Sequence, residues 1–296
     1  MKGSLAAMAH TAKAIVKSGV KLKGDLWVIA WVGHEAPHGR GEGPKAIAQA
    51  INRGEIKVDA AVITEGWIDC VMVAQGGMAI FTITVSGPKV SYHSTQAPLR
   101  KNPVLWTSEL IQELHRYDEE LNEKDWHPLI RERPHLQICI VKGGDFYNRV
   151  PTKVEVTGNV RWDPGQTVED VRKELELRLS RLQRRLWHKY DMSVAFDLKL
   201  DLVREAAETS PEEEIVKKAL KAAKKVTGRE IGIFGSRGVG DASIINEVAK
   251  IPTISYGPFG YPITAHSDNE YQETKDLETV SKVYLALAID YCGVKE

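Results

Sequence analysis

Two regions of the chain, one at each end, alternate apolar strand segments with helical segments. In the first region, continuous apolar segments at 25–32 and 59–64 flank a helical pattern at 44–52. Strands that are buried on both faces have this continuous apolar composition, and their alternation with helices is typical of an α/β domain. The same alternation returns from residue 211 onward. The sequence therefore predicts one doubly wound α/β domain that is built from two distant parts of the chain.

The chain opens on a helical pattern. Apolar residues at 5–9 and 12–16 recur with helical spacing, and Ser18-Gly19 supplies a stop signal. A helix that covers the sheet of an α/β domain usually follows a strand. Here the sequence places no strand before the helix, so we expect the natural chain to extend upstream of Met1.

The central region has a different order of elements. The pattern predicts a strand at 79–87, a helix at 103–121, strands at 135–144 and 153–162, a helix at 168–187 and a strand at 193–200. This β-α-β-β-α-β order is the ferredoxin-like arrangement. We therefore expect a first part of the α/β domain at 1–76, a ferredoxin-like insertion at 77–200 and a second part of the α/β domain at 201–296.

The composition excludes several classes of protein. Lys and Arg number 40, and Asp and Glu also number 40, so no net charge favours binding to nucleic acid or to a membrane surface. The predicted strands of the insertion lack the interleaved aromatic residues of RNA-binding sheets. No segment is long and apolar enough for a membrane span. The three scattered cysteines match no zinc or disulfide pattern, which predicts a cytoplasmic protein.

Three chemically versatile residues come just after strands of the predicted α/β domain. Glu35 and Glu65 follow the two strands of its first part, and His266 follows the last strand of its second part. Ligands of α/β sheets gather beyond the carboxyl ends of the strands, so these side chains are expected to converge. One imidazole and two carboxylates suit zinc, cobalt or manganese. The alternative for each of these residues is a purely structural role, as a helix cap or an ordinary loop residue.

Other candidates are more ambiguous on their own. His93 is either a half-exposed loop residue or a catalytic imidazole. Arg161 is either a solvated charge at a strand end or a fork for a carboxylate, and Asn148 fits ordinary turn chemistry. Asp241 begins a predicted helix, and we interpret it as a helix N-cap.

Several motifs together carry a resemblance to a known family. They are "MKGSLAAM", Glu65 in a position where the family has a Glu-Pro ligand motif, "TVSGPKVSYHS", "GGDFYNRVP", "GNVRWDPG", "GVGDAS" and "YGPFGYPITAHSDNEY". In these motifs the chain resembles the acetylornithine deacetylase, succinyl-diaminopimelate desuccinylase, aminoacylase and glutamate carboxypeptidase family of dinuclear zinc hydrolases. The resemblance covers essentially the whole chain. It implies that the inserted domain is a lid and dimerisation domain.

The resemblance also implies roles for individual residues. Glu65 and His266 match ligands of different zinc ions. Where the family has a general base followed by a ligand, this chain has His34-Glu35, so Glu35 aligns as a ligand and His34 as the base. A shift of one residue makes Glu35 the base instead, and the identity of the base stays open.

The remaining matches concern the substrate. His93 matches a lid histidine that steadies the oxyanion in a neighbouring subunit. Asn148 and Arg161 match residues that hold the substrate carboxylate, and the loop from Gly257 to Gly260 lines the same pocket. The family's other ligands, a His-x-Asp motif and a bridging aspartate, would lie upstream of Met1.

These matches imply a homodimeric amidohydrolase with two zinc ions per subunit, or cobalt or manganese in their place. Its substrates would be N-acyl amino acids or short peptides with a free carboxylate. The alternative hypothesis is a non-catalytic relative that acts as a dimeric binding module.

Overall fold

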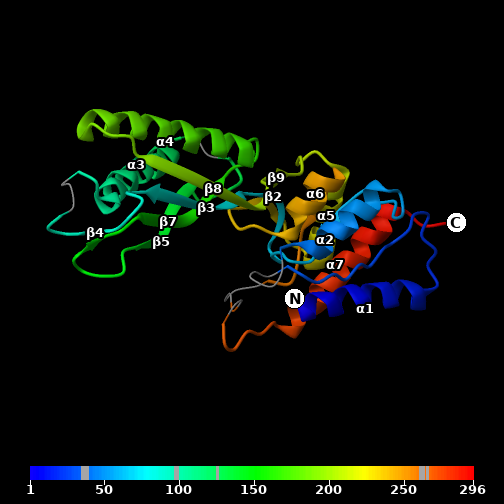
Figure 1. Cartoon of the computed structure of the whole chain (residues 1–296). Helices are drawn as coiled ribbons and strands as arrows, with labels where there is room; N and C mark the ends of the chain where they lie inside the picture. Colours follow the sequence, from blue (N-terminus) through cyan, green and yellow to red (C-terminus); the bar gives the residue numbers. More distant parts are fainter. Residues whose placement is uncertain (35–39, 97–99, 125–126, 260–263, 265–266) are drawn as a thin grey trace. The chain divides into compact units, whose positions relative to one another are not determined.

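The computed structural model describes residues 1–34, 40–96, 100–124, 127–259, 264 and 267–296. The chain divides into two compact units, which are drawn in Figure 1. Unit 1 comprises Met1–Gln75 and Ala207–Glu296, and unit 2 comprises Gly76–Ala206. In the described part of the chain, no helix has the length and apolar character needed to cross a membrane.

Unit 1 combines five helices and five strands among its described residues. The helices are α1 (Lys2–Ser18), α2 (Glu42–Asn52), α5 (Glu214–Thr227), α6 (Asp241–Ala249) and α7 (Thr274–Cys292). The strands are β1 (Ala61–Ile63), β2 (Cys70–Gln75), β9 (Ala207–Glu208), β10 (Gly232–Ser236) and β11 (Thr253–Ser255). As predicted, α1 ends where Gly19 adopts a left-handed conformation.

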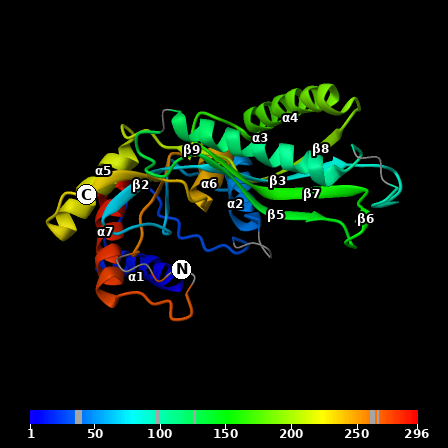
Figure 2. The same cartoon turned by 90° about the vertical axis from the view of Figure 1, so that its left-hand side faces the viewer.

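These strands form one mixed sheet in the order β1-β11-β2-β10, and β9 also pairs with β2. The β1–β11 and β2–β10 pairs are parallel, whereas β2 runs antiparallel to β11 and β9. Helix α6 packs against β1, β9, β11 and helix α2, while α1 and α5 pack against α7. Figure 2 shows the same helices from the side. The predicted α/β architecture is thus confirmed.

The predicted strand at 25–32 is wrong for this structure. No residue of this segment belongs to a strand ladder in the described chain, and Trp27 and Val32 are 54% and 83% exposed. A strand exists only through hydrogen bonds to a neighbouring strand, so an apolar composition alone does not create one. Trp31 instead packs against a small cluster between α2, β1 and α6. Conversely, β2 was not predicted, because a short apolar segment has no periodicity of its own.

Unit 2 has the predicted ferredoxin-like order. Its elements are β3 (Gly77–Ser86), β4 (Tyr92–His93), α3 (Pro103–Glu123), β5 (His135–Gly143), β6 (Arg149–Val150), β7 (Lys153–Trp162), α4 (Val168–Tyr190) and β8 (Ala195–Arg204). The four long strands form an antiparallel sheet in the order β5-β7-β3-β8, and β4 pairs with β6. Residues of β3 and β7 alternate between buried and more exposed positions, as expected for a sheet with one covered face.

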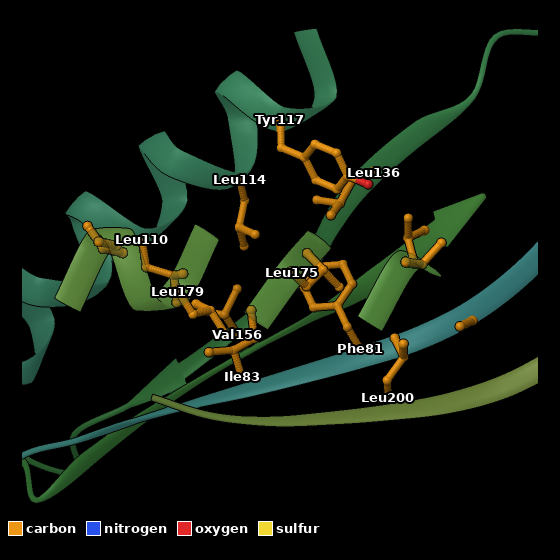
Figure 3. Packing of buried hydrophobic residues seen from close by; sticks show 14 of the residues in the cluster. Phe81, Ile83, Leu110, Leu114, Tyr117, Leu136, Val156, Leu175, Leu179 and Leu200 are labelled. Carbon is orange, nitrogen blue, oxygen red and sulfur yellow. The ribbon is translucent and has the colours of Figure 1, made fainter. Parts of the chain in front are cut away.

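The core of unit 2 lies between this sheet and its two helices. Figure 3 shows helical side chains that point toward the covered face of the sheet. The labelled residues come from both layers and all belong to one buried cluster: Leu110, Leu114, Tyr117, Leu175 and Leu179 from the helices, and Phe81, Ile83, Leu136, Val156 and Leu200 from the strands. Helix α4 begins with a complete capping box between Thr167 and Asp170, which satisfies backbone N–H groups of its first turn.

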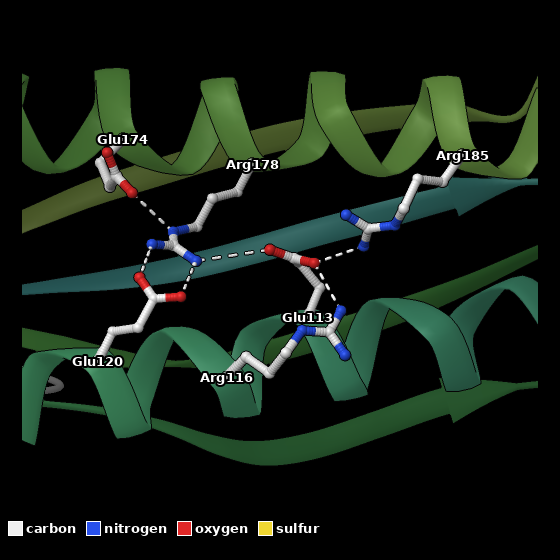
Figure 4. A network of polar contacts seen from close by, with 6 residues as sticks. All are labelled: Glu113, Arg116, Glu120, Glu174, Arg178 and Arg185. Carbon is white, nitrogen blue, oxygen red and sulfur yellow. Dashed lines mark hydrogen bonds and ion pairs between the residues drawn. The ribbon is translucent and has the colours of Figure 1, made fainter.

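A network of charged side chains joins α3 to α4 (Figure 4). Arg178 of α4, whose side chain is 9% exposed, forms ion pairs with Glu113 and Glu120 of α3 and with Glu174 of its own helix. Its guanidinium also lies 4.3 Å from the centre of the Tyr117 ring. Glu113 in turn accepts hydrogen bonds from Arg116 and Arg185. Each buried charge in this network therefore has opposite charges within contact distance.

Replacing Arg178 with methionine should destabilise unit 2. The change leaves three carboxylates without their shared cation. Removing one partner of a buried ion pair lowers the free energy of unfolding by about 3 kcal/mol. Native-state hydrogen exchange measures this loss as a decrease in the opening free energy of the β3 and β7 amides. Arg181→Met is the matched control, because Arg181 is an exposed residue of the same helix. The control should change the opening free energy by less than about 0.5 kcal/mol, and equal losses in the two variants would refute the role of the network.

The same network should make unit 2 sensitive to acid. Burial alone would raise the pKa of the Glu113 carboxyl, but hydrogen bonds from Arg116 and Arg185 outweigh it and hold the pKa below its ordinary value. The carboxyl therefore stabilises unit 2 above its unfolded pKa of about 4.3, and this contribution disappears as the pH falls through the lower folded value.

We expect the opening free energy of unit 2 amides to fall between about pH 5 and about pH 3, and to fall less in Glu113→Gln. Hydrogen exchange at several pH values, corrected for intrinsic exchange rates, measures how steeply the opening free energy falls with pH in the wild type and in the variant. Identical slopes in the wild type and the variant would contradict this assignment.

Candidate functional site

The parallel pairing of β1 with β11 positions the candidate site. Beyond the last residues of these strands, Ile63 and Ser255, the two chains continue side by side. The Tyr256 N–H donates to the Ile63 carbonyl at 3.0 Å, and the Phe259 N–H donates to the Gly66 carbonyl at 3.0 Å. Glu65 lies within this continuation, at the carboxyl end of β1. Functional side chains are expected at this edge of an α/β sheet.

Two glycines allow the close approach of these segments. A Cβ atom on Gly257 would lie 2.1 Å from the Thr64 carbonyl oxygen and 2.8 Å from the Gly66 nitrogen. A Cβ atom on Gly66 would lie 2.8 Å from the Tyr256 nitrogen. Real Cβ atoms do not approach backbone this closely, so larger residues would push the segments apart. Gly257 thereby helps to position Glu65, which lies between Thr64 and Gly66.

His34 lies between two carboxylates. Its Nδ1 is 2.9 Å from Asp241 Oδ1, and its Nε2 is 3.9 Å from Glu65 Oε2. Asp241 is only 4% exposed, and its second oxygen accepts a hydrogen bond from Trp31 Nε1 at 2.8 Å. The structure therefore brings His34 close to Glu65, whereas the predicted convergence of Glu65 with Glu35 and His266 involves two residues outside the described part of the chain.

The interpretation of Asp241 as a helix cap is wrong. Helix α6 has Gly240 at its N-cap position, and no side chain caps it. Asp241 is the first helical residue, and its carboxylate instead contacts His34 and Trp31. A buried carboxylate needs hydrogen-bond partners, and Trp31 and His34, which lie about 200 residues away in the chain, contact this one.

The opening motif of the chain also reaches this edge of the sheet. The hydroxyl of Thr64, the residue before Glu65, lies 3.9 Å from the sulfur of Met1. Helix α1 therefore begins beside the end of β1. The position of "MKGSLAAM" near the site agrees with its place among the motifs that carry the family resemblance.

The predicted lid residues lie in unit 2. Strands β4 and β6 pair, with His93 opposite Arg149, and this pairing brings His93 beside Asn148. The Asn148 amide nitrogen is 3.1 Å from His93 Nε2, and the Thr95 hydroxyl is 2.8 Å from His93 Nδ1. Neighbouring side chains therefore hold the imidazole at both nitrogens. Arg161 is half-buried in β7, between Met78 of β3 and His135 of β5.

Three predicted site residues, Glu35, Gly260 and His266, lie outside the described residues. Within the described part, no group of three His, Cys, Asp or Glu side chains is arranged to hold a metal ion. His34 and Glu65 still offer an imidazole nitrogen and a carboxylate, which are donors that zinc, cobalt and manganese accept. The donor chemistry of these two residues therefore suits a transition-metal ion.

Comparison with protein-family models decides the family. The model described as "Peptidase family M20/M25/M40" matches residues 1–290. The chain belongs to this family. It is a hydrolase of the peptidase and amidohydrolase type, and its resemblance to the dinuclear zinc hydrolases is thus confirmed at the family level.

Individual relatives agree with this assignment. The succinyl-diaminopimelate desuccinylase of Alkalilimnicola ehrlichii is 25% identical over 292 residues, which cover 96% of this chain and 71% of the relative. A tripeptidase from Staphylococcus aureus has a similar structure, with a TM-score of 0.74 and 18% identity over 97% of this chain and 69% of the other. A dinuclear metal-binding M20 peptidase of Bacillus subtilis gives a TM-score of 0.66 and 16% identity, over 97% of this chain and 70% of the other.

Sequence reasoning missed two contributors to the site. Asp241 was assigned a local role because the start of a helix explains an aspartate well, and Trp31 was assigned only to a strand. Their hydrogen bond joins segments that only the folded chain brings together. One usable signal was the position of Asp241 after strand β10, because that placement is shared with other functional residues of α/β sheets.

Replacing Gly257 with alanine should destabilise unit 1 and lower hydrolase activity. The added methyl group overlaps the Thr64 carbonyl, and such overpacking costs about 1–3 kcal/mol. Unfolding in urea measures the loss of stability, and steady-state assays measure activity. Gly232→Ala is the matched control, since a Cβ atom at Gly232 meets nothing within 4 Å. Unchanged stability and activity in Gly257→Ala would show that the close approach is not needed.

Proposed function

We propose that the protein is a metal-dependent amidohydrolase that cleaves N-acyl amino acids or short peptides with a free carboxylate. The observation that carries this proposal is the meeting of His34 and Glu65, 3.9 Å apart, beyond the carboxyl end of β1. Relatives named as a desuccinylase and a tripeptidase support an amide bond as the target. The acyl group and the amine that the enzyme prefers are left to the experiment below.

The proposed metal ligands are Glu35, Glu65 and His266, with zinc as the metal and cobalt or manganese as substitutes. The donor set at the described residues supports this, as does the dinuclear metal-binding relative of known structure. When bound, a metal ion of this kind lowers the pKa of a water molecule toward about 7 and polarises the substrate carbonyl.

The chain itself supplies the proton transfer. A general base accepts the proton of the attacking water and passes it to the leaving amine. We assign this role to His34 or Glu35, which stand where the family has its base and ligand pair.

Residues of unit 2 are proposed to act on the substrate. The imidazole of His93 donates to the oxyanion of the tetrahedral intermediate, and the Thr95 backbone N–H, which donates to Nδ1, supports a ring proton on Nε2. The guanidinium of Arg161 and the amide of Asn148 hold the substrate carboxylate. Gly257 and Gly260 line the pocket.

We further propose that the protein is a cytoplasmic homodimer that associates through unit 2. The three cysteines are free, which supports a reducing compartment. The family resemblance, in which a lid histidine serves the neighbouring subunit, supports the dimer.

The proposal is tested with the purified full chain and a panel of N-acetyl and N-succinyl amino acids and dipeptides. We expect hydrolysis of at least one class, loss of activity after chelation, and recovery when zinc, cobalt or manganese is added back. A chain that is folded, binds metal and cleaves none of these substrates would contradict the proposal and favour the binding-module alternative.

The proposed binding of the substrate carboxylate by Arg161 is tested separately. Arg161→Met should raise KM for a free-carboxylate substrate by about 10- to 100-fold, because hydrogen bonds to charged groups contribute about 1.5–3 kcal/mol. The matched control is the same substrate with its carboxylate amidated, which the wild type should bind poorly and the variant should bind no worse. An unchanged KM for both substrates would exclude Arg161 from substrate binding.

A further inference from the structure

The imidazole of His34 contacts a carboxylate at each of its two nitrogen atoms. Asp241 is almost completely buried, and its two oxygens contact Trp31 Nε1 and His34 Nδ1 at 2.8 and 2.9 Å. The opposite edge of the imidazole faces Glu65, with 3.9 Å between Nε2 and Oε2. His34 therefore has one nitrogen directed at a buried carboxylate and the other directed at a partly exposed one.

The contact with Asp241 determines the tautomer of the ring. A carboxylate accepts hydrogen bonds but has none to donate, so the proton of the neutral imidazole belongs on Nδ1. The lone pair then lies on Nε2, on the side of Glu65. Trp31 adds to this constraint, because its N–H occupies the other carboxylate oxygen and holds Asp241 in place.

The contacts of His34 resemble those of a metal-bound histidine, in which one ring nitrogen faces a carboxylate and the other faces the metal site. Metal-ligating histidines commonly donate their second N–H to a carboxylate, which orients the ring and raises its basicity. Two ligands of a tetrahedral zinc ion, with bonds of about 2.0–2.1 Å, lie about 3.3 Å apart. The separation of 3.9 Å between His34 Nε2 and Glu65 Oε2 is only slightly larger.

We propose that His34 is a metal ligand through Nε2, next to Glu65, and that Asp241 is the positioning residue that orients it. The inference rests on the proposed metal-dependent function and changes one role within it. A nitrogen lone pair that binds a metal ion cannot also accept a proton. His34 is then not the general base, although it occupies the position where the family has one.

The experiment compares three variants of the full chain with the wild type. Zn²⁺ affinity is measured by competition with a chromophoric chelator. Removing the ligand in His34→Gln should weaken binding on the order of 100-fold or more, and Asp241→Asn should weaken it about 10- to 100-fold. His10→Gln is the matched control, because His10 is an exposed residue of α1. This control should bind Zn²⁺ like the wild type.

A second readout separates a ligand from a nearby base. In Co²⁺-loaded protein, the N–H proton of each coordinated imidazole gives a strongly shifted, exchangeable proton NMR signal. We expect His34→Gln to lose one such signal and His10→Gln to lose none. Circular dichroism checks that each variant is folded. If Asp241→Asn fails to fold, His34→Gln alone decides the inference.

The outcomes distinguish the inference from the proposed function. Weaker Zn²⁺ binding together with the loss of one signal in His34→Gln supports His34 as a ligand. If the wild type and His34→Gln bind Zn²⁺ equally and show the same signals, the inference is overturned while the metal-dependent function stands. If the wild type binds none of Zn²⁺, Co²⁺ and Mn²⁺, both the inference and the proposed function are overturned.

Discussion

The candidate site depends on the parallel pairing of β1 with β11. This pairing carries the carboxyl ends of two strands, almost 200 residues apart in the chain, to one edge of the sheet. The backbone continues in contact beyond both strands, and it does so only because Gly66 and Gly257 have no side chains. Glu65 therefore projects from a segment that is held by backbone hydrogen bonds to its neighbour. These bonds restrict the conformations of the Glu65 backbone before any ligand binds.

A buried carboxylate connects this edge to the helix that covers it. Asp241 begins α6, and its contacts with Trp31 and His34 join it to the segment that precedes α2. Burying a carboxylate without partners is costly, so these contacts favour docking of the segment. The same contact that gives Asp241 a partner also directs the other edge of the His34 imidazole toward Glu65.

Unit 2 is stabilised by different means. Its apolar core lies between an antiparallel sheet and two helices, and charges between α3 and α4 neutralise one another around Arg178 and Glu113. Such a network contributes less to stability than an apolar core, but it penalises any shift of one helix along the other. The short β4–β6 pairing then places His93 and Asn148 in contact on this framework.

The sequence by itself determined the architecture. The alternation of apolar segments and helices predicts the α/β unit, and the β-α-β-β-α-β order predicts the ferredoxin-like unit, because hydrophobic periodicity is a local property. It also offered Glu65 and His93 as candidates from their positions after predicted strands, and it offered His34 from the family resemblance alone. Periodicity failed at 25–32, because an apolar segment becomes a strand only when a neighbour supplies hydrogen bonds.

Only the tertiary structure decided how the site is assembled. The role of Asp241 depends on Trp31 and His34, which lie about 200 residues away, and no local pattern reports that contact. The tautomer and direction of His34 follow from the same contact. Local sequence specifies which groups are present, whereas the pairing of distant segments specifies which groups meet.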